Sequence, residues 1–135
     1  MRIVNDFPPN ISQIKQAFDI EGKNSIVFTY GDILYVPSGH KTLPQHLMVH
    51  EETHSKQQRE YGSIDSWWGN YIRDPNFRLL QELEAYRNQY KHICETEVRQ
   101  QRRSLLTILA RDLSGPIYGY VITFEKAKEL IQNNG

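Results

Sequence analysis

The chain has 135 residues, of which 39% are apolar and 24% charged, and its 16 basic residues equal its 16 acidic residues in number. This length and balance predict one compact domain over residues 1–135. A net charge of zero offers no basic footprint for a phosphate backbone, so composition argues against a nucleic-acid-binding protein. The single cysteine, Cys94, has no disulfide partner, and no run approaches the ~18 apolar residues of a membrane span. We therefore expect a cytoplasmic protein with no membrane partner.

The first elements in chain order are predicted to be a short helix and a β-hairpin. Apolar residues recur at helical spacing over residues 11–18. Residues 26–30 and 33–36 are rich in β-branched and aromatic side chains, which favour strands. Gly31-Asp32 separates the two runs, and a two-residue loop of this kind suits a tight hairpin turn.

Two helices are predicted next. Thr42 is placed to cap a helix that begins near Leu43-Pro44 and ends at about Gly62, because proline suits the first helical turn. A second helix over residues 63–72 must end near Asp74-Pro75, since the residue before a proline disfavours the helical conformation.

Three more helices complete the prediction. One begins at Asn76, one ends before Ser114-Gly115-Pro116, and Thr123 caps the last, which runs through Ile131. The apolar faces expected for the first two are Leu79, Leu80, Leu83, Tyr86, Tyr90 and Cys94, and then Leu105, Leu106, Ile108, Leu109 and Leu113. The predicted fold class is therefore α+β, mainly α-helical, with a small β element near the N-terminus.

The strongest chemical signal lies on the helix predicted over residues 43–62. Residues 50–54 read His-Glu-Glu-Thr-His, the HExxH pattern. Residues four apart stack one helical turn above each other, so His50 and His54 can bind one Zn²⁺ together. At ~100° per residue Glu51 falls on the side of the histidines, whereas Glu52 falls on the opposite side. We therefore expect Glu51, and not Glu52, to act beside the metal.

A catalytic zinc needs a third protein ligand and an open position for water. Glu82 and Glu84, on the helix that follows Asn76, are the best candidates. They lie about 200° apart on the helix, and each borders the apolar face, so periodicity does not choose between them.

HExxH followed on a later helix by Glu-x-x-Ala resembles the zincin metallopeptidases of the gluzincin kind. The wider chain is similar to small, mostly uncharacterised zincin-like proteins encoded by phages, over VFTYGDILYVPSG, HLMVHEETHSKQQ, WWGNYIRDPNFRLLQELEAYRNQY and LSGPIYGY. The resemblance implies Zn²⁺ held by His50, His54 and Glu82, with Glu51 as the general base. It also implies hydrolysis of a peptide or protein substrate by zinc-activated water, a small sheet over the HExxH helix and, for a phage protein, the host cytoplasm.

One position departs from the family pattern. Gluzincins often carry Asp or Asn four residues after the third ligand, and this chain has Tyr86 there. Its hydroxyl can orient a histidine or stabilise an oxyanion, which makes it a catalytic candidate, or the ring can simply pack in the core.

Several readings remain open at this point. Residues 33–36, or their partner strand, are expected to bind an extended peptide by strand addition. The rival to an enzyme is a non-catalytic zinc-binding module for phage assembly or host interaction, and hydrolysis of another amide, as in a cell wall, is a third possibility. His46, His40 and His92 are expected outside the ligand set, and Cys94 is expected to be buried and inert.

Overall fold

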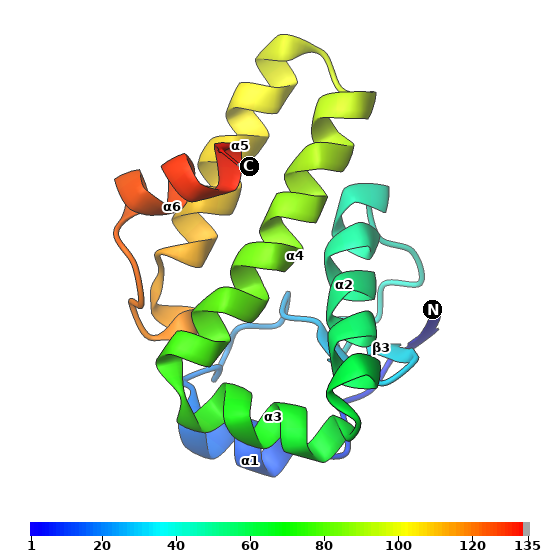
Figure 1. Cartoon of the computed structure of the whole chain (residues 1–135). Coiled ribbons are helices and arrows are strands. Elements are labelled where there is room, and N and C mark those ends of the chain that lie inside the picture. The colour runs from blue at the N-terminus through cyan, green and yellow to red at the C-terminus, as the bar shows by residue number, and fades with distance from the viewer. Residues whose placement is uncertain (134–135) are drawn as a thin grey trace.

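A computed structural model describes residues 1–133 and shows an α+β fold (Figure 1). Within these residues it has six α-helices and one three-stranded sheet near the N-terminus, which confirms the predicted fold class. The predicted hairpin forms from β2 (Phe28–Tyr30) and β3 (Ile33–Tyr35), which pair antiparallel. Gly31 takes a φ of +64°, a left-handed conformation that glycine adopts without the steric cost of a side chain.

A third strand, β1 (Arg2–Val4), was not predicted. It pairs parallel with β3, so the strand order is β1-β3-β2 and β3 is the central strand. The expectation that residues 33–36 accept a peptide by strand addition is therefore wrong, because both edges of β3 are already paired. Its partner β2 is an edge strand, but the Thr29 carbonyl already accepts Gln58 Nε2 at 2.9 Å and Trp68 Nε1 at 3.1 Å.

Two helices flank the β2–β3 hairpin in sequence. The predicted first helix is α1 (Ile11–Ala17), and the helix that carries His50 is α2 (Gln45–Tyr61). Thr42 does not cap α2: Pro44 occupies the N-cap position, and no side chain bonds to the first turn. The carbonyl of Pro44 already accepts from Leu47 and Met48, so the helix begins directly after the proline.

The next two helices meet at the predicted boundary. Helix α3 (Ile64–Arg73) is capped by Ser63, and α4 (Pro75–Thr96) begins directly after Asp74. The Asp74 carboxylate accepts from the backbone N–H groups of Asn76 and Phe77 at 2.9 and 3.3 Å. This cap and the proline at the first position of α4 fix the sharp change of direction seen between α3 and α4 in Figure 1.

The C-terminal part consists of α5 (Arg99–Leu113), the 3₁₀ turn η1 (Pro116–Tyr118) and α6 (Phe124–Gln132). Thr123 caps α6 as predicted, with its side chain accepting from Lys126 N–H at 3.3 Å. Two expected core residues are instead in solvent: Leu80 is 63% exposed and Ile108 is 47% exposed. Leu80 follows the partly buried Leu79, and Ile108 precedes the buried Leu109, so each lies at the edge of its helix's buried face, which is narrower than the apolar series.

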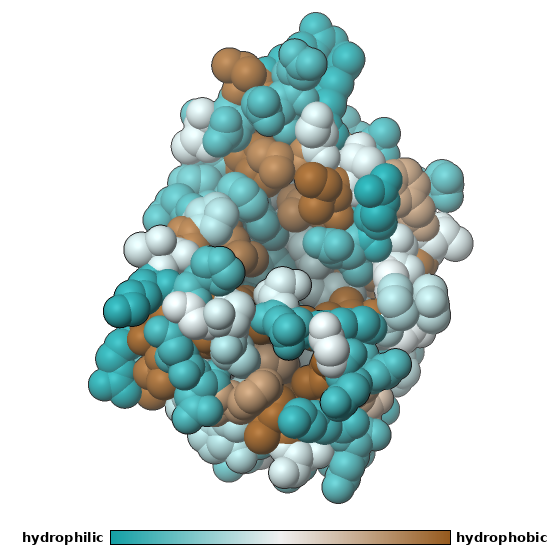
Figure 2. All heavy atoms as spheres, turned by 180° about the vertical axis from the view of Figure 1, so that it is seen from behind, coloured by the Kyte–Doolittle hydropathy of each residue, from teal (hydrophilic) through white to brown (hydrophobic). Residues whose placement is uncertain are grey.

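The core has two apolar clusters, and α4 contributes buried residues to one and packs Phe77 against the other. Helix α4 runs through the middle of the molecule (Figure 1). One cluster joins the inner faces of α4, α5 and α6, and the other joins α1, β2 and α3. Seen from behind, the surface is hollowed near its middle, with hydrophobic side chains beside the hollow (Figure 2). No helix in residues 1–133 has both the length and the apolar character that crossing a membrane requires.

Candidate metal centre

Helix α2 turns His50, Glu51 and His54 into the interior, where each is 5% exposed. One ligand atom from each of the three residues lies within 4.8 Å of the others, so this buried group can hold a metal ion. Glu52 is exposed on the outer side of the helix, as the helical geometry predicted. The assignment of Glu51 rather than Glu52 to the inner face is therefore confirmed.

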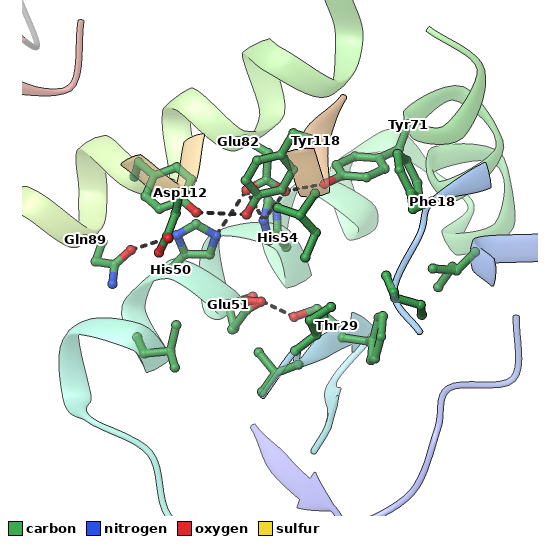
Figure 3. A pocket seen from close by; sticks show the side chains of 18 of the residues that line it. Phe18, Thr29, His50, Glu51, His54, Tyr71, Glu82, Gln89, Asp112 and Tyr118 are labelled. Atoms are coloured by element: carbon green, nitrogen blue, oxygen red, sulfur yellow. Dashed lines mark hydrogen bonds and ion pairs between the residues drawn. The ribbon is translucent and has the colours of Figure 1, made fainter. Parts of the chain in front are cut away.

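Helix α4 brings Glu82 to the same point (Figure 3). Its Oε1 lies 3.2 Å from His50 Nε2 and 3.3 Å from His54 Nε2. Zinc bonds of about 2.0–2.1 Å in a tetrahedron place neighbouring ligand atoms about 3.3–3.4 Å apart. The spacing of the two imidazoles from this carboxylate is thus the spacing that a shared zinc ion needs.

Glu84 lies away from the two histidines. It is exposed, and its Oε1 accepts a hydrogen bond from Gln57 Nε2 at 2.7 Å. Packing thus places Glu82, and not Glu84, beside the two histidines, a distinction that periodicity left open.

Two glutamines orient the histidine rings. His50 Nδ1 lies 2.9 Å from Gln89 Oε1, and His54 Nδ1 lies 2.8 Å from Gln57 Oε1. An amide oxygen only accepts hydrogen bonds, so each Nδ1 must carry the proton. The Nε2 atoms, which face Glu82, are then the nitrogens available to a metal.

The orientation of each glutamine is itself fixed. Gln57 Nε2 donates to the Gln81 carbonyl at 3.0 Å, and Gln89 Nε2 donates to His46 Nδ1 at 2.8 Å. His46 is therefore a half-buried residue behind the ligands rather than a ligand, as expected. The remaining histidines lie outside the group: His40 is exposed and His92 is half-buried. Cys94 is only half-buried, which corrects the expectation of a buried cysteine.

The charges of the group depend on its burial. Burial raises the pKa of the Glu51 carboxyl, and the neighbouring imidazoles offset this only in part. Burial alone would lower the pKa of His54, but the Glu82 carboxylate outweighs it and raises that pKa to about 9. Burial alone would raise the pKa of Glu82, but the histidines hold it well below its usual range. Without a metal, the centre is thus a buried carboxylate balanced by positive charge on imidazole.

Three tyrosine hydroxyls surround the group. Tyr71 donates to Glu82 Oε2 at 2.5 Å, and this oxygen also lies 3.2 Å from His54 Nε2, so the carboxylate is held by both residues. Tyr86 and Tyr118 share a hydrogen bond of 2.8 Å between their hydroxyls. Burial, with the Glu82 charge, raises the pKa of Tyr71 and Tyr118 well above the usual range, so both remain protonated donors.

Tyr86 packs its ring 4.4 Å from the His50 ring and is 5% exposed. It does not orient His50, because Gln89 already occupies His50 Nδ1. Of the roles expected for Tyr86, packing in the core is confirmed. Its hydroxyl lies beside the cavity with that of Tyr118, and a catalytic role stays a prediction.

Sequence reasoning missed Gln89 and Tyr71. Gln89 follows Glu82 by seven residues, which is two helical turns on the same face of α4, and that spacing was a usable signal. Tyr71 comes from a different helix, and no spacing rule links it to Glu82.

The group forms the wall of a cavity of about 360 Å³. Figure 3 shows Gln89, Asp112 and His50 on one side of it, Tyr71 and Phe18 on the other, and His54 and Glu82 between them. Trp67 supports the wall: its ring lies 5.5 Å from that of His54 and stacks on Tyr71 at 5.0 Å, and its Nε1 donates to Gln81. Comparison of the chain with family models, curated proteins and solved structures finds no match.

Proposed function

We propose that this protein is a zinc-dependent hydrolase that cleaves peptide bonds. The observation that carries the proposal is the buried set of two imidazoles and one carboxylate, whose oxygen lies 3.2 and 3.3 Å from the two imidazole nitrogens, with a second carboxylate, Glu51, beside it. Two nitrogens and one oxygen form a donor set suited to Zn²⁺, and three protein ligands leave a position for water. Bound zinc supplies a water of lowered pKa and polarises a carbonyl oxygen.

In this proposal His50, His54 and Glu82 hold the ion, and Glu51 is the general base. Burial raises the pKa of Glu51 towards the range in which a carboxylate accepts a proton from water and then returns it to a leaving amine. The paired hydroxyls of Tyr86 and Tyr118 offer a hydrogen bond to the negative charge that develops on the carbonyl oxygen.

The size and lining of the cavity favour a peptide over a very small substrate. Its volume of about 360 Å³ lies within the range of ligand pockets, and it is lined on one side by apolar residues. Glu51 favours the enzyme over a non-catalytic zinc module, because a site that only binds a partner has no chemical use for a buried base beside an open metal position.

The test is the pair of variants Glu51→Gln and Glu52→Gln. Glu51→Gln should retain zinc and the fold, while hydrolysis of a peptide library falls by about 10²- to 10⁴-fold, as for loss of a general base. Glu52→Gln, on the exposed face, should hydrolyse at close to the wild-type rate. 1,10-Phenanthroline should abolish activity, and added zinc should restore it.

Hydrolysis that survives both Glu51→Gln and chelation would contradict this mechanism. A zinc-loaded wild type that cleaves no peptide or protein would instead favour the non-catalytic zinc-binding module for phage assembly or host interaction.

A further inference from the structure

We infer that the cavity selects ligands with a cationic group on the His50 side of the metal centre and an apolar side chain on the Phe18 side, and that Asp112 is the residue that selects the cation. The inference deepens the proposed function, on which it rests for the cleavage step, by naming the class of peptide.

Asp112 is a carboxylate that no Lys or Arg of the cavity lining pairs with. It lies on α5, near the C-terminal end of the helix, and lines the cavity on the side of His50 (Figure 3). It is exposed, and none of the ion pairs formed by residues 1–133 includes it. Partial burial raises the pKa of Asp112, and the nearby charges of Arg111 and His50 offset this only in part. An ammonium or guanidinium group of a ligand would supply the missing positive charge.

The charge of the whole lining favours a cation. The described residues that line the cavity include Glu51, Glu82 and Asp112 but no Lys or Arg. The two positive charges of a divalent metal ion would compensate the negative charges of Glu51 and Glu82, and the negative charge of Asp112 would then remain uncompensated. A free peptide carboxylate would find no basic side chain in this lining, so the geometry disfavours a carboxypeptidase.

The opposite end of the cavity is apolar. Phe18, Ile20 and Ile26 line it and are only half-buried, so they leave apolar surface for a ligand. Ile14 and Phe28, which belong to the buried cluster of α1, β2 and α3, also line the cavity. The metal ligands lie between this wall and Asp112 (Figure 3), so an extended ligand that reaches both passes the metal.

The test measures binding apart from catalysis, by isothermal titration calorimetry on the zinc-loaded Glu51→Gln protein. One pair of blocked peptides carries Lys or uncharged norleucine next to a Phe, and a second pair carries a free or an acetylated N-terminus. The two pairs distinguish a side-chain cation from an N-terminal ammonium. We expect the cationic member of at least one pair to bind roughly threefold to tenfold more tightly, as for a partly exposed charge pair, and less so at high salt.

Adding Asp112→Asn should bring that affinity ratio to about one. The matched control, Asp32→Asn, removes the same charge from the hairpin turn outside the cavity lining, and should keep the ratio. Equal affinities within both pairs, a ratio that persists in Asp112→Asn, or no binding of any peptide would overturn the inference.

Wild-type hydrolysis separates this inference from the proposed function. Peptides that bind with the cationic preference but are not cleaved leave the inference standing and argue against the hydrolase. Peptides that are cleaved but bind with no preference for the cation support the hydrolase and refute the inference.

Discussion

Glu82 and Glu84 are two residues apart, yet the structure gives them opposite environments. Glu82 is 3% exposed and faces two imidazoles, whereas Glu84 is exposed. Helical geometry correctly separated Glu51 from Glu52 because one face of α2 carries both histidines. It was unable to separate Glu82 from Glu84, because each borders the apolar stripe of α4 and only the packing of α4 on α2 decides between them.

The pair yields a prediction for metal content. Glu82→Gln replaces a carboxylate ligand by a neutral amide, so zinc per purified chain, measured by atomic absorption, should fall strongly. Glu84→Gln should retain wild-type content, because its amide oxygen still accepts the bond from Gln57. Full zinc content in Glu82→Gln, or loss in Glu84→Gln, would contradict the ligand set.

Residues that support the ligands were the hardest to predict. Tyr71 reaches Glu82 from another helix, and its bond depends on the angle between α3 and α4. Such contacts follow from tertiary packing, and neither composition nor periodicity carries that information.

At the scale of elements, sequence patterns predicted helix ends correctly where a residue next to the helix caps it. Thr123 accepts from the first turn of α6, and the boundary at Asp74-Pro75 is as predicted. Thr42 failed because Pro44 begins α2 without a side-chain cap. Strand β1 was missed because it has three residues and pairs with a strand about 30 positions away, which no local pattern indicates.

Asp74 gives the prediction at this scale. It caps α4 through two backbone N–H groups, and its own N–H ends α3 at the Asn70 carbonyl. Asp74→Ala should lower the free energy of unfolding by about 1 kcal/mol, the usual cost of losing such a cap. Urea denaturation followed by circular dichroism measures this. The exposed Asp19→Ala should stay within about 0.5 kcal/mol of wild type, and equal losses in both variants would argue against the cap.

At the scale of the molecule, the metal centre lies where α2 and α4 meet, between the two apolar clusters. A ligand that binds only the folded chain stabilises it, by about 2.7 kcal/mol at a free concentration a hundredfold above its Kd.

The fold class was predictable from the helical series and the hairpin. The relative placement of the two clusters was not, because it depends on contacts between elements distant in the sequence.

Removal of the metal should therefore be visible in the thermal unfolding of the whole chain. Saturating zinc should raise the Tm by roughly 10 °C for a domain of this size. Differential scanning calorimetry of the chelated and zinc-loaded protein measures the shift, and His50→Ala should abolish it. A Tm that does not respond to zinc in the wild type would contradict a metal centre that joins the two helices.

The positions of Trp67 and Trp68 have a spectroscopic consequence. They are the only two tryptophans in the sequence, both are buried, and both line the cavity. All indole emission of the protein therefore originates beside His54 and Tyr71, whereas the far-ultraviolet dichroism comes from helices throughout the chain. The two signals are thus independent probes: if they change together on heating, the site unfolds with the domain, and if emission changes first, the site loosens within a folded scaffold.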